Sequence, residues 1–385
     1  MSEIDLVCRV CGTAALDEFP QFARLPRVTS DCRPFPAGGR LAICGQCAAV
    51  QKPVDARWRE EAAAIYAAYD VYFQSGGIEQ AVFDRATGTP RRRSAVLVDR
   101  LAASRPIAET GRVLDVGCGN GALLSAFAEA QPGWRLFGHD LSEINRAALS
   151  RIPGFKQLYT GPMDAVPGGF DLVTLSHSLE HFTEPVEELA SLRAKLAAGA
   201  CLFIEVPDAA ATPFDLLVAD HVSHFTADSV SRVLGRAGFD PLIVAPDWVV
   251  KELSVVAEPG VGARPAATPP QATSRRVAAQ LAWLQALIDG ARAAAATARP
   301  FGLFGTSVAA MWLFGEVGDA VEFFADEDPS RRGRRLLDRP ILHPGDVPAG
   351  ATVYVPLIPR VAQAVAARAS GSGADFRLPP AFPAV

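Results

Sequence analysis

The sequence predicts a three-part α/β protein: a doubly wound core around a parallel sheet, a small N-terminal module and a smaller C-terminal α/β domain. Three observations lead to this prediction. Apolar, strand-like runs alternate with Ala/Leu-rich helical patterns from residue 111 to residue 258. A glycine-rich turn, VLDVGCGNGALL, interrupts the first of these strands at residues 113–124. Two C-x-x-C pairs near the N-terminus mark the small module.

Length and composition set the outer bounds. A chain of 385 residues is too long for a single core, and its 49% hydrophobic and 21% charged residues are ordinary for a globular protein. The net charge of −5 gives no basic field for nucleic acid or an anionic membrane. No apolar run is long enough to span a bilayer, and the start, MSEIDLVCRV, lacks a signal-peptide pattern. We therefore expect a cytoplasmic protein that binds neither nucleic acid nor membrane.

The N-terminal module, residues 1–60, is defined by two cysteine pairs, Cys8-x-x-Cys11 and Cys44-x-x-Cys47. Two such knuckles bring four thiolates within tetrahedral reach of one zinc ion. We expect this zinc to be structural, because a closed set of four ligands leaves no place for a substrate. Ordinary reduced thiols and a redox pair are the alternatives. The remaining cysteines are expected to be packing residues: Cys32, Cys118 and Cys201.

Residues 61–110 form a linking segment that we expect to be largely helical. It contains Tyr72 and the basic run Arg91–Arg93. We interpret the basic run as the solvated face of a helix over residues 78–104.

The core, residues 111–258, is expected to contain five strands separated by helices, then a helix over 226–237 and a closing antiparallel pair. The five strands are RVLDVG, RLFGHD, KQLYTG, FDLVTLS and CLFIEVP, and the closing pair is GFDPLIVAP and KELSVVAEP. An open sheet of this kind binds ligands beyond the carboxyl ends of its strands.

The glycine turn at the first strand is the strongest candidate for a cofactor site. Gly117, Gly119 and Gly121 permit positive φ and let a ligand lie against bare backbone. The helix that follows directs free N–H groups at that ligand. Asp115 precedes the turn, and the second strand ends in Asp140, where a carboxylate can accept both hydroxyls of a ribose.

A histidine-containing segment, His177-Ser178-Leu179-Glu180-His181, follows the fourth strand. The pattern H-x-x-E-H is also a zinc-protease signature. We reject that interpretation because the segment falls beside the predicted cofactor crevice. His177 or Ser178 is expected to line the bound cofactor, whereas His181 is equally well explained as a packing residue.

The segment after the fifth strand, FDLLVADHVSHFT at residues 214–226, is the strongest catalytic candidate. It contains Asp220, His221 and His224 at the end of the sheet where substrate chemistry is expected. Histidine is suited to remove a proton near neutral pH. A structural hydrogen-bonding role is the alternative for His221.

The C-terminal third begins with a proline- and alanine-rich linker at residues 259–273, which leads into a helix ending at 297. Residues 298–385 repeat the strand–helix–strand logic in FGLFGTSVAAMWLFG, VEFFADED and TVYVPLIP, with a loose tail after residue 370. The turn at Gly302–Gly305 and the four arginines between residues 331 and 335 could bind a nucleotide diphosphate. A nicotinamide-type site and a non-binding scaffold are the alternatives.

The pattern D-x-G-x-G-x-G resembles motif I of the class I S-adenosylmethionine-dependent methyltransferases, and Asp140 resembles their motif II acid. The resemblance implies a Rossmann-like methyltransferase core with S-adenosylmethionine as its cofactor. The residues implied to bind it are Asp115, Gly117, Gly119, Gly121, Asp140, Leu141, His177 and Ser178.

A narrower resemblance covers nearly the whole chain. Zinc knuckles, a methyltransferase core, the IEVP strand, the DH-x-S-x-F loop and a C-terminal Rossmann-like domain resemble the sugar C-methyltransferases that act on nucleotide-linked deoxy-keto sugars. The segment Asp326–Gly333 resembles their D-x-N-P-x-x-x-G segment. Their loop reads roughly Y-H-E-H-x-S-Y-F. The family's histidine base falls on His221, its glutamate on Asp220, and its two tyrosines on Val218 and His224.

These resemblances imply an enzyme that methylates a carbon atom of a nucleotide-linked sugar, with His221 as base, Asp220 orienting or assisting it, and Tyr72 approaching the acceptor. An O- or N-methyltransferase acting on a surface glycan or secondary metabolite is the alternative within enzymes. A non-catalytic ligand-binding or scaffold protein is the alternative of another class, and the intact glycine turn argues against it. The sequence does not fix the oligomeric state.

Overall fold

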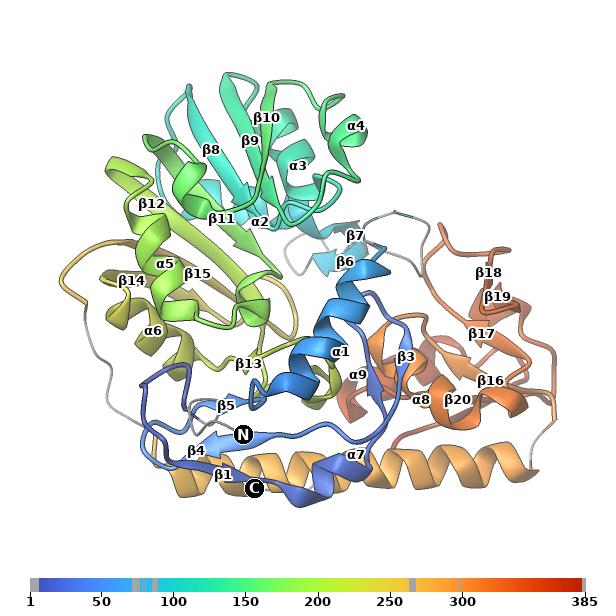
Figure 1. Ribbon diagram of the computed structural model, residues 1–385. Helices are drawn as coiled ribbons and strands as arrows, with labels where there is room; N and C mark the ends of the chain where they lie inside the picture. The colour runs from blue at the N-terminus through green and yellow to red at the C-terminus, as the bar shows by residue number, and fades with distance from the viewer. Residues whose placement is uncertain are drawn as a thin grey trace.

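The computed structural model describes residues 7–70, 77, 79, 81–84, 89–262, 268–297 and 299–382. Its largest sheet has seven strands in the order β10-β9-β8-β11-β12-β15-β14 (Figure 1). The strands run parallel except β15, which is antiparallel to both of its neighbours. Their bounds are β8 (Gly111–Val116), β9 (Trp134–Asp140), β10 (Phe155–Thr160), β11 (Phe170–Ser176), β12 (Leu196–Pro207), β14 (Phe239–Ala245) and β15 (Glu252–Pro259). The predicted doubly wound α/β core is confirmed.

Helices cover both faces of this sheet, and each face has its own apolar core. One core joins the sheet to α2 and α3, and the other joins it to α5 and α6. The helices are α2 (Arg93–Ser104), α3 (Ala122–Ala130), α4 (Arg146–Leu149), α5 (Pro185–Arg193) and α6 (Ala227–Arg236). The chain leaves β8 toward β9 on one side and returns to β11 on the other, so β8 marks the topological switch point at which such sheets bind ligands.

The N-terminal module does not complete its own sheet. Three of its strands, β1 (Leu16–Glu18), β4 (Ala42–Cys44) and β5 (Val50–Gln51), are joined by β13 (Ser223–His224), which belongs to the loop after β12. A further bridge links Val28 to Val218 in the same loop. The module also contains η2 (Pro20–Arg24), β2 (Arg27–Val28) and β3 (Pro34–Phe35), and α1 (Ala56–Ala67) follows it. The loop predicted to carry the catalytic residues is therefore part of the N-terminal sheet.

The segment before α2 differs from the prediction of a helix over residues 78–104. The structure has a hairpin there, β6 (Ala81–Asp84) with β7 (Thr89–Arg92), and the helix begins only at Arg93. Pro90 explains the difference, because proline lacks an amide donor and drives the preceding residue toward extended backbone.

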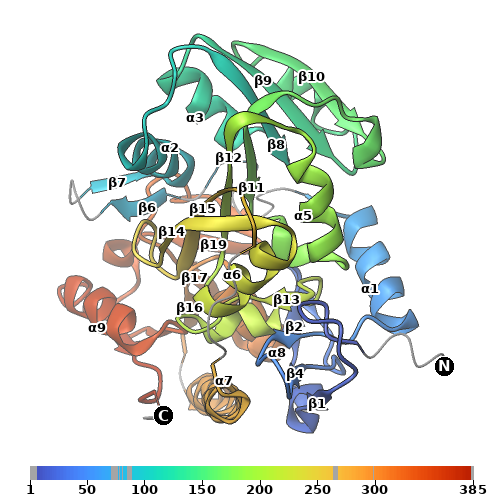
Figure 2. The same cartoon turned by 90° about the vertical axis from the view of Figure 1, so that its left-hand side faces the viewer.

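The 28-residue helix α7 (Pro270–Thr297) runs along the base of the molecule, beneath the N-terminal sheet and beside the C-terminal sheet (Figures 1 and 2). It begins within the predicted linker, at a proline, which is favoured at the first helical position. One apolar core joins α7, α8 (Val308–Val317), the N-terminal module and η6 (Pro213–Leu217). Among the described residues, no helix combines the length and the apolar character needed to cross a bilayer.

The C-terminal sheet has six strands in the order β18-β19-β17-β16-β20-β21. Strand β21 pairs in parallel with β20, so the tail expected to be loose is instead anchored by a strand. The elements are β16 (Phe301–Phe304), α8 (Val308–Val317), η7 (Gly318–Ala320), β17 (Phe323–Ala325), β18 (Arg335–Leu336), β19 (Arg339–Leu342), η8 (Pro344–Asp346), β20 (Thr352–Tyr354), α9 (Pro359–Arg368) and β21 (Asp375–Arg377).

Candidate functional site

The glycine turn between β8 and α3 adopts a backbone that only glycine tolerates well. Gly117, Gly119 and Gly121 have φ of 75°, 52° and 83°. A Cβ atom at Gly117 would lie 2.6 Å from the Cβ of Ser178, so the turn also needs a residue without a side chain for steric reasons. The turn is therefore bare backbone at the carboxyl edge of the sheet.

Asp140 closes this site from the end of β9. Its Oδ2 accepts a hydrogen bond of 2.8 Å from the amide of Gly119. Leu141, which follows it, is 78% exposed, and Ile144 is 79% exposed. The structure thus brings the glycine turn and the predicted acid together, and places two exposed apolar side chains close to that acid in the chain.

Two of the predicted cofactor residues turn away from the open side of the turn. Asp115 is buried and accepts a hydrogen bond of 2.6 Å from Thr174 on the adjacent strand β11. The Ser178 hydroxyl is buried and donates to the carbonyl of Val116 over 2.8 Å. Both side chains are thus engaged with backbone or side-chain partners next to the turn, and their predicted contact with the cofactor stays a prediction.

Burial and, to a smaller extent, the charge of Asp140 raise the pKa of Asp115 to about 7, against the hydrogen bond from Thr174. In the unfolded chain the group loses its proton near pH 4. Between these values the folded state binds more protons than the unfolded state, so this group's contribution to stability falls as pH rises from 4 to 7.

Asp115→Asn removes this pH-dependent penalty and can still accept the Thr174 hydrogen bond. We expect its gain in the free energy of unfolding to be about 2–3 kcal/mol larger at pH 8 than at pH 5. Urea unfolding at both pH values measures this. Asp171→Asn, at an exposed site on β11, is the control. Equal gains for Asp115→Asn at the two pH values would contradict the prediction.

The histidines after β12 are held by a residue that the sequence did not single out. Asp215, in η6, accepts from Nδ1 of His221 through Oδ1 and from Nδ1 of His224 through Oδ2, both at 2.7 Å. Burial opposes ionisation of Asp215, but the charge of His224 and the hydrogen bonds from both rings hold its pKa below the usual range. Asp215 is therefore a buried carboxylate that orients two imidazoles. Its place in the same loop, six residues before His221, was the signal that could have found it.

The two histidines differ in what their second ring nitrogens can do. Nε2 of His224 lies 3.1 Å from Nζ of Lys52, and burial together with the Lys52 charge lowers the pKa of His224 to about 4. His224 is 1% exposed and both of its ring nitrogens have partners, which favours a structural role over the predicted catalytic one. Nε2 of His221 makes no hydrogen bond within the described residues. Although burial opposes the protonated ring, the Asp215 hydrogen bond and charge raise the pKa of His221.

Asp220 does not orient His221, contrary to the expectation from the sequence. It is fully buried and accepts hydrogen bonds from the amide, over 2.9 Å, and the hydroxyl of Ser30. It also lies 3.4 Å from Nδ1 of His181. Its charge still contributes to the raised pKa of His221. Asp220 can therefore assist His221 electrostatically, but it does not orient the ring by a hydrogen bond.

The N-terminal module and α1 hold the backbone of this loop from the other side. Nζ of Lys52 donates to the carbonyls of Val218 and His221, the latter over 3.0 Å. Nε1 of Trp58 donates to the carbonyl of Ala219 over 3.0 Å. These contacts join residues more than 150 positions apart, which explains why sequence reasoning missed them.

A tyrosine of α1 lies beside the histidines. The hydroxyl of Tyr66, on α1, lies 3.0 Å from Nδ1 of His181. His181 in turn packs edge-on against His221, with the ring centroids 4.7 Å apart. Tyr66 therefore supports the imidazole pair. Tyr72, the predicted acceptor contact, lies outside the described residues.

The four predicted metal ligands meet in one cluster. The sulfur atoms of Cys8, Cys11, Cys44 and Cys47 lie within 4.8 Å of one another. The Sγ atoms of Cys8 and Cys47, and those of Cys11 and Cys44, are 3.5 Å apart. The amides of Gln46 and Cys47 point at Sγ of Cys44 over 3.4 Å. Hydrogen bonds from Cys47 and Cys8 lower the pKa of Cys44, which favours a thiolate there. Four convergent sulfur atoms fit the tetrahedral ligand set of zinc.

The C-terminal unit uses its central arginine internally. Arg331 is 3% exposed, donates to the hydroxyl of Thr306 and pairs with Asp326 over 3.0 Å. Arg332 pairs with Asp346 at the surface over 2.7 Å. The arginines expected to hold a nucleotide diphosphate are thus tied to partners of their own unit at these two positions.

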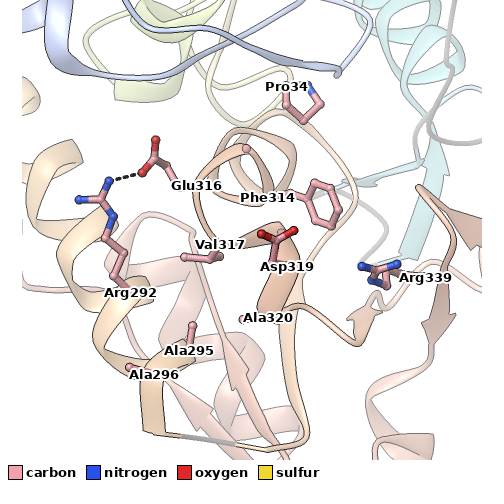
Figure 3. Close-up of a pocket in the computed structure, with 12 residues that line it drawn as sticks. Pro34, Arg292, Ala295, Ala296, Phe314, Glu316, Val317, Asp319, Ala320 and Arg339 are labelled. Atoms are coloured by element: carbon pink, nitrogen blue, oxygen red, sulfur yellow. Dashed lines mark hydrogen bonds and ion pairs between the residues drawn. The ribbon is translucent and has the colours of Figure 1, made fainter.

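A pocket of about 570 Å³ is lined by residues of α7, α8 and β3 (Figure 3). Its charged residues include Arg292, which pairs with Glu316, and Arg339, whose Nε donates to the carbonyl of Val321 over 2.6 Å. The residues lining it include no histidine or cysteine, so it offers no group for the expected chemistry.

Residues 89–243 match a methyltransferase domain family. An uncharacterized protein of Synechococcus sp. is 31% identical over 104 residues, which are 25% of each protein, so the chain spans about a quarter of that relative's length. A solved S-adenosylmethionine-dependent methyltransferase from Clostridium acetobutylicum is similar with a TM-score of 0.38 at 12% identity, over 46% of this chain and 94% of that one. The solved structure of the mitomycin 7-O-methyltransferase is similar with a TM-score of 0.39 at 21% identity, over 46% of this chain and 56% of that one.

Proposed function

We propose that this chain, which is a methyltransferase by its domain, binds S-adenosylmethionine across the glycine turn and Asp140. The proposal is carried by one observation: three glycines with positive φ, the start of α3 and a carboxylate at the end of β9 converge at the switch point of the sheet. Backbone amides there face the ligand, and Asp140 accepts the ribose hydroxyls. The exposed Leu141 provides an apolar surface for the adenine ring.

Asp140→Ala is expected to weaken S-adenosylmethionine binding by about 2–3 kcal/mol. The variant loses two hydrogen bonds to a charged acceptor, each worth about 1.5–3 kcal/mol, and water compensates in part. Isothermal titration of the full chain measures the change. Glu143→Ala, at an exposed carboxylate nearby that pairs with Arg146, is the matched control. An unchanged dissociation constant for Asp140→Ala would show that the ribose is held elsewhere.

We infer that the acceptor binds above the Asp215–His221 pair and that His221 is the general base. An ionised carboxylate on Nδ1 fixes the ring so that Nε2 carries the lone pair. The site excludes most water, since His221 is 5% exposed. Geometry supplies much of the remaining catalysis, because a methyl group leaves a sulfonium readily.

The acceptor that we propose is a nucleotide-linked deoxy-keto sugar, methylated on the carbon beside its keto group. His221 takes the proton of that C–H bond, the electron pair becomes an enolate, and the enolate carbon attacks the methyl group as the C–S bond breaks. The DH-x-S-x-F loop and the paired cysteines support this choice, since both occur in the sugar C-methyltransferases that the sequence resembles. The location of a ¹³C-labelled methyl group on carbon or on oxygen of the product, read by NMR, separates C- from O-methylation.

We further propose that the four cysteines hold one structural zinc ion. The closed cluster supports this, because it leaves no open position for a substrate. The ion would tie the first knuckle to the second, which connects β4 to β5.

A further inference from the structure

Three acidic side chains that the proposed reaction does not use gather at the carboxyl edge of the large sheet. Glu205 lies near the end of β12, and Glu252 begins the antiparallel neighbour β15 at the same edge. His177 follows β11 directly, and its amide donates to the carbonyl of Glu205 over 2.9 Å. One ligand atom from each of His177, Glu205 and Glu252 lies within 4.8 Å of the other two. Glu180, the third acid, lies on the Nδ1 side of His177.

Each of the three clustered side chains has a buried polar atom that lacks a hydrogen-bond partner. Within the described part of the chain, Nε2 of His177, Oε1 of Glu205 and Oε2 of Glu252 are buried atoms that make no hydrogen bond. Glu205 is fully buried, and only its other oxygen has a partner, the hydroxyl of Ser176 at 3.1 Å. A buried carboxylate oxygen left unpaired is costly. The cluster therefore calls for a positive charge at its centre.

Among the described residues, no cationic side chain donates a hydrogen bond to these unpartnered oxygens. The closest approach is between Nε2 of His177 and Oε2 of Glu252, at 3.3 Å. Arg93 is the cation whose charge acts on both of these groups. Lys251 is a second cation, and its charge acts on Glu252. Neither of these two cations satisfies Oε1 of Glu205 or Oε2 of Glu252, because both oxygens lack a hydrogen-bond partner in the part of the chain that the structure describes.

We propose that His177, Glu205 and Glu252 bind a divalent metal cation. One imidazole and two carboxylates form a donor set that suits cations of the Mn²⁺ and Zn²⁺ kind. Nδ1 of His177 lies 3.4 Å from Oε1 of Glu180, the arrangement in which a carboxylate orients a metal-binding imidazole through its second nitrogen. His177 has φ of 53°, a left-handed backbone conformation that is uncommon for residues other than glycine. Such strained conformations are often found at functional sites.

The placement suggests what the cation does, and this part rests on the proposed function. The side chains of His177 and Glu252 are 25% and 16% exposed, so the cluster is open to solvent. Glu180 links it to the base, since one of its oxygens also lies within 4.8 Å of a ligand nitrogen of His221. A cation there would bind the keto oxygen of the acceptor and stabilise the enolate charge as His221 removes the proton.

Titration of the full-length protein with Mn²⁺, followed by the loss of the free-ion EPR signal, tests the site. We expect one bound Mn²⁺ per chain with a dissociation constant below about 1 mM, without acceptor or S-adenosylmethionine. Thiolates are poor ligands for Mn²⁺, so the cysteine cluster does not account for it. Binding below that limit supports the proposal, and its absence in the wild-type protein overturns it.

Variants assign the bound ion to these residues. Glu205→Gln and Glu252→Gln are each expected to raise the dissociation constant at least about tenfold. Glu258→Gln, at an exposed site on the same strand β15, is the matched control and should bind Mn²⁺ as the wild type does. Equal binding by all three variants would overturn the site. Because the titration contains no acceptor, its outcome is independent of whether the protein methylates carbon.

Discussion

Replacing His221 with alanine is expected to lower the turnover of methyl transfer by about 10²–10⁴-fold, the usual contribution of a general base. The residue is 5% exposed, with Nδ1 fixed by Asp215 and Nε2 without a partner among the described residues. S-adenosylmethionine affinity should remain, because the ring belongs to the loop after β12 and not to the glycine turn. Steady-state rates together with isothermal titration measure both effects. His343→Ala, which removes a histidine of the C-terminal unit, is the control.

The same variant decides between carbon and oxygen as the methylated atom. With S-adenosylhomocysteine in place of S-adenosylmethionine, the wild-type enzyme should exchange the acceptor's α-proton with deuterated water, and His221→Ala should abolish the exchange. An O-methyltransferase would show no such exchange. A rate for His221→Ala within about threefold of the wild type, far short of a general base's contribution, would remove His221 from that role.

The pH profile separates the base from the residue that orients it. Only the neutral ring can accept a proton, so the rate should fall as pH drops through the raised pKa of His221. Asp215→Asn removes the charge that raises this pKa. The acid limb of its profile should therefore move to lower pH, whereas a merely structural role for Asp215 would lower the rate without moving the limb.

Cys44→Ser is expected to reduce the zinc content from about one ion per chain to near zero and to unfold the N-terminal knuckles. Structural zinc contributes on the order of 10–16 kcal/mol to the folding of small modules, so the loss of one ligand exceeds what the local packing can replace. Elemental analysis and thermal unfolding measure the two effects. Cys32→Ala, at a buried cysteine outside the cluster, should keep its zinc. Freshly purified wild-type protein without metal would contradict the zinc assignment.

The loss of zinc should also disturb the loop that contains His221. Cys44 ends β4, β4 pairs with β5, and β5 pairs with β13, which contains His224. We therefore expect Cys44→Ser to abolish methyl transfer while the affinity for S-adenosylmethionine stays within about threefold, a shift below 1 kcal/mol.

The features that the sequence predicted well are local ones. The glycine turn, the strand before it and the helix after it lie within a dozen residues, and backbone rules alone define them. Asp140 was found because it ends the next strand, and parallel strands present their carboxyl ends at one edge. The cysteine pairs were found for a similar reason, since each knuckle is a short turn.

Side chains whose partners are set by tertiary contacts between distant segments could not be predicted from the sequence. Asp220 is adjacent to His221 in the chain, yet Asp215 in η6 is the residue that hydrogen-bonds to the rings of His221 and His224. Asp220 instead accepts a hydrogen bond from Ser30. Lys52 carried no local signal at all, because its three partners lie in a loop more than 160 positions away. Glu205 and Glu252 appeared as ordinary strand residues until the antiparallel pairing of β12 and β15 placed them together.

The shared sheet β1-β4-β5-β13 also constrains the order in which the protein can mature. During synthesis the knuckles emerge first and can capture their metal early, but their sheet stays one strand short until Ser223–His224 has left the ribosome. Closing that pairing is a non-local event with a large loop to order, so it should be slow relative to the formation of the separate elements. The first sixty residues are thus unsuited to transfer into another protein, because the strand that completes their sheet, β13, belongs to the loop after β12.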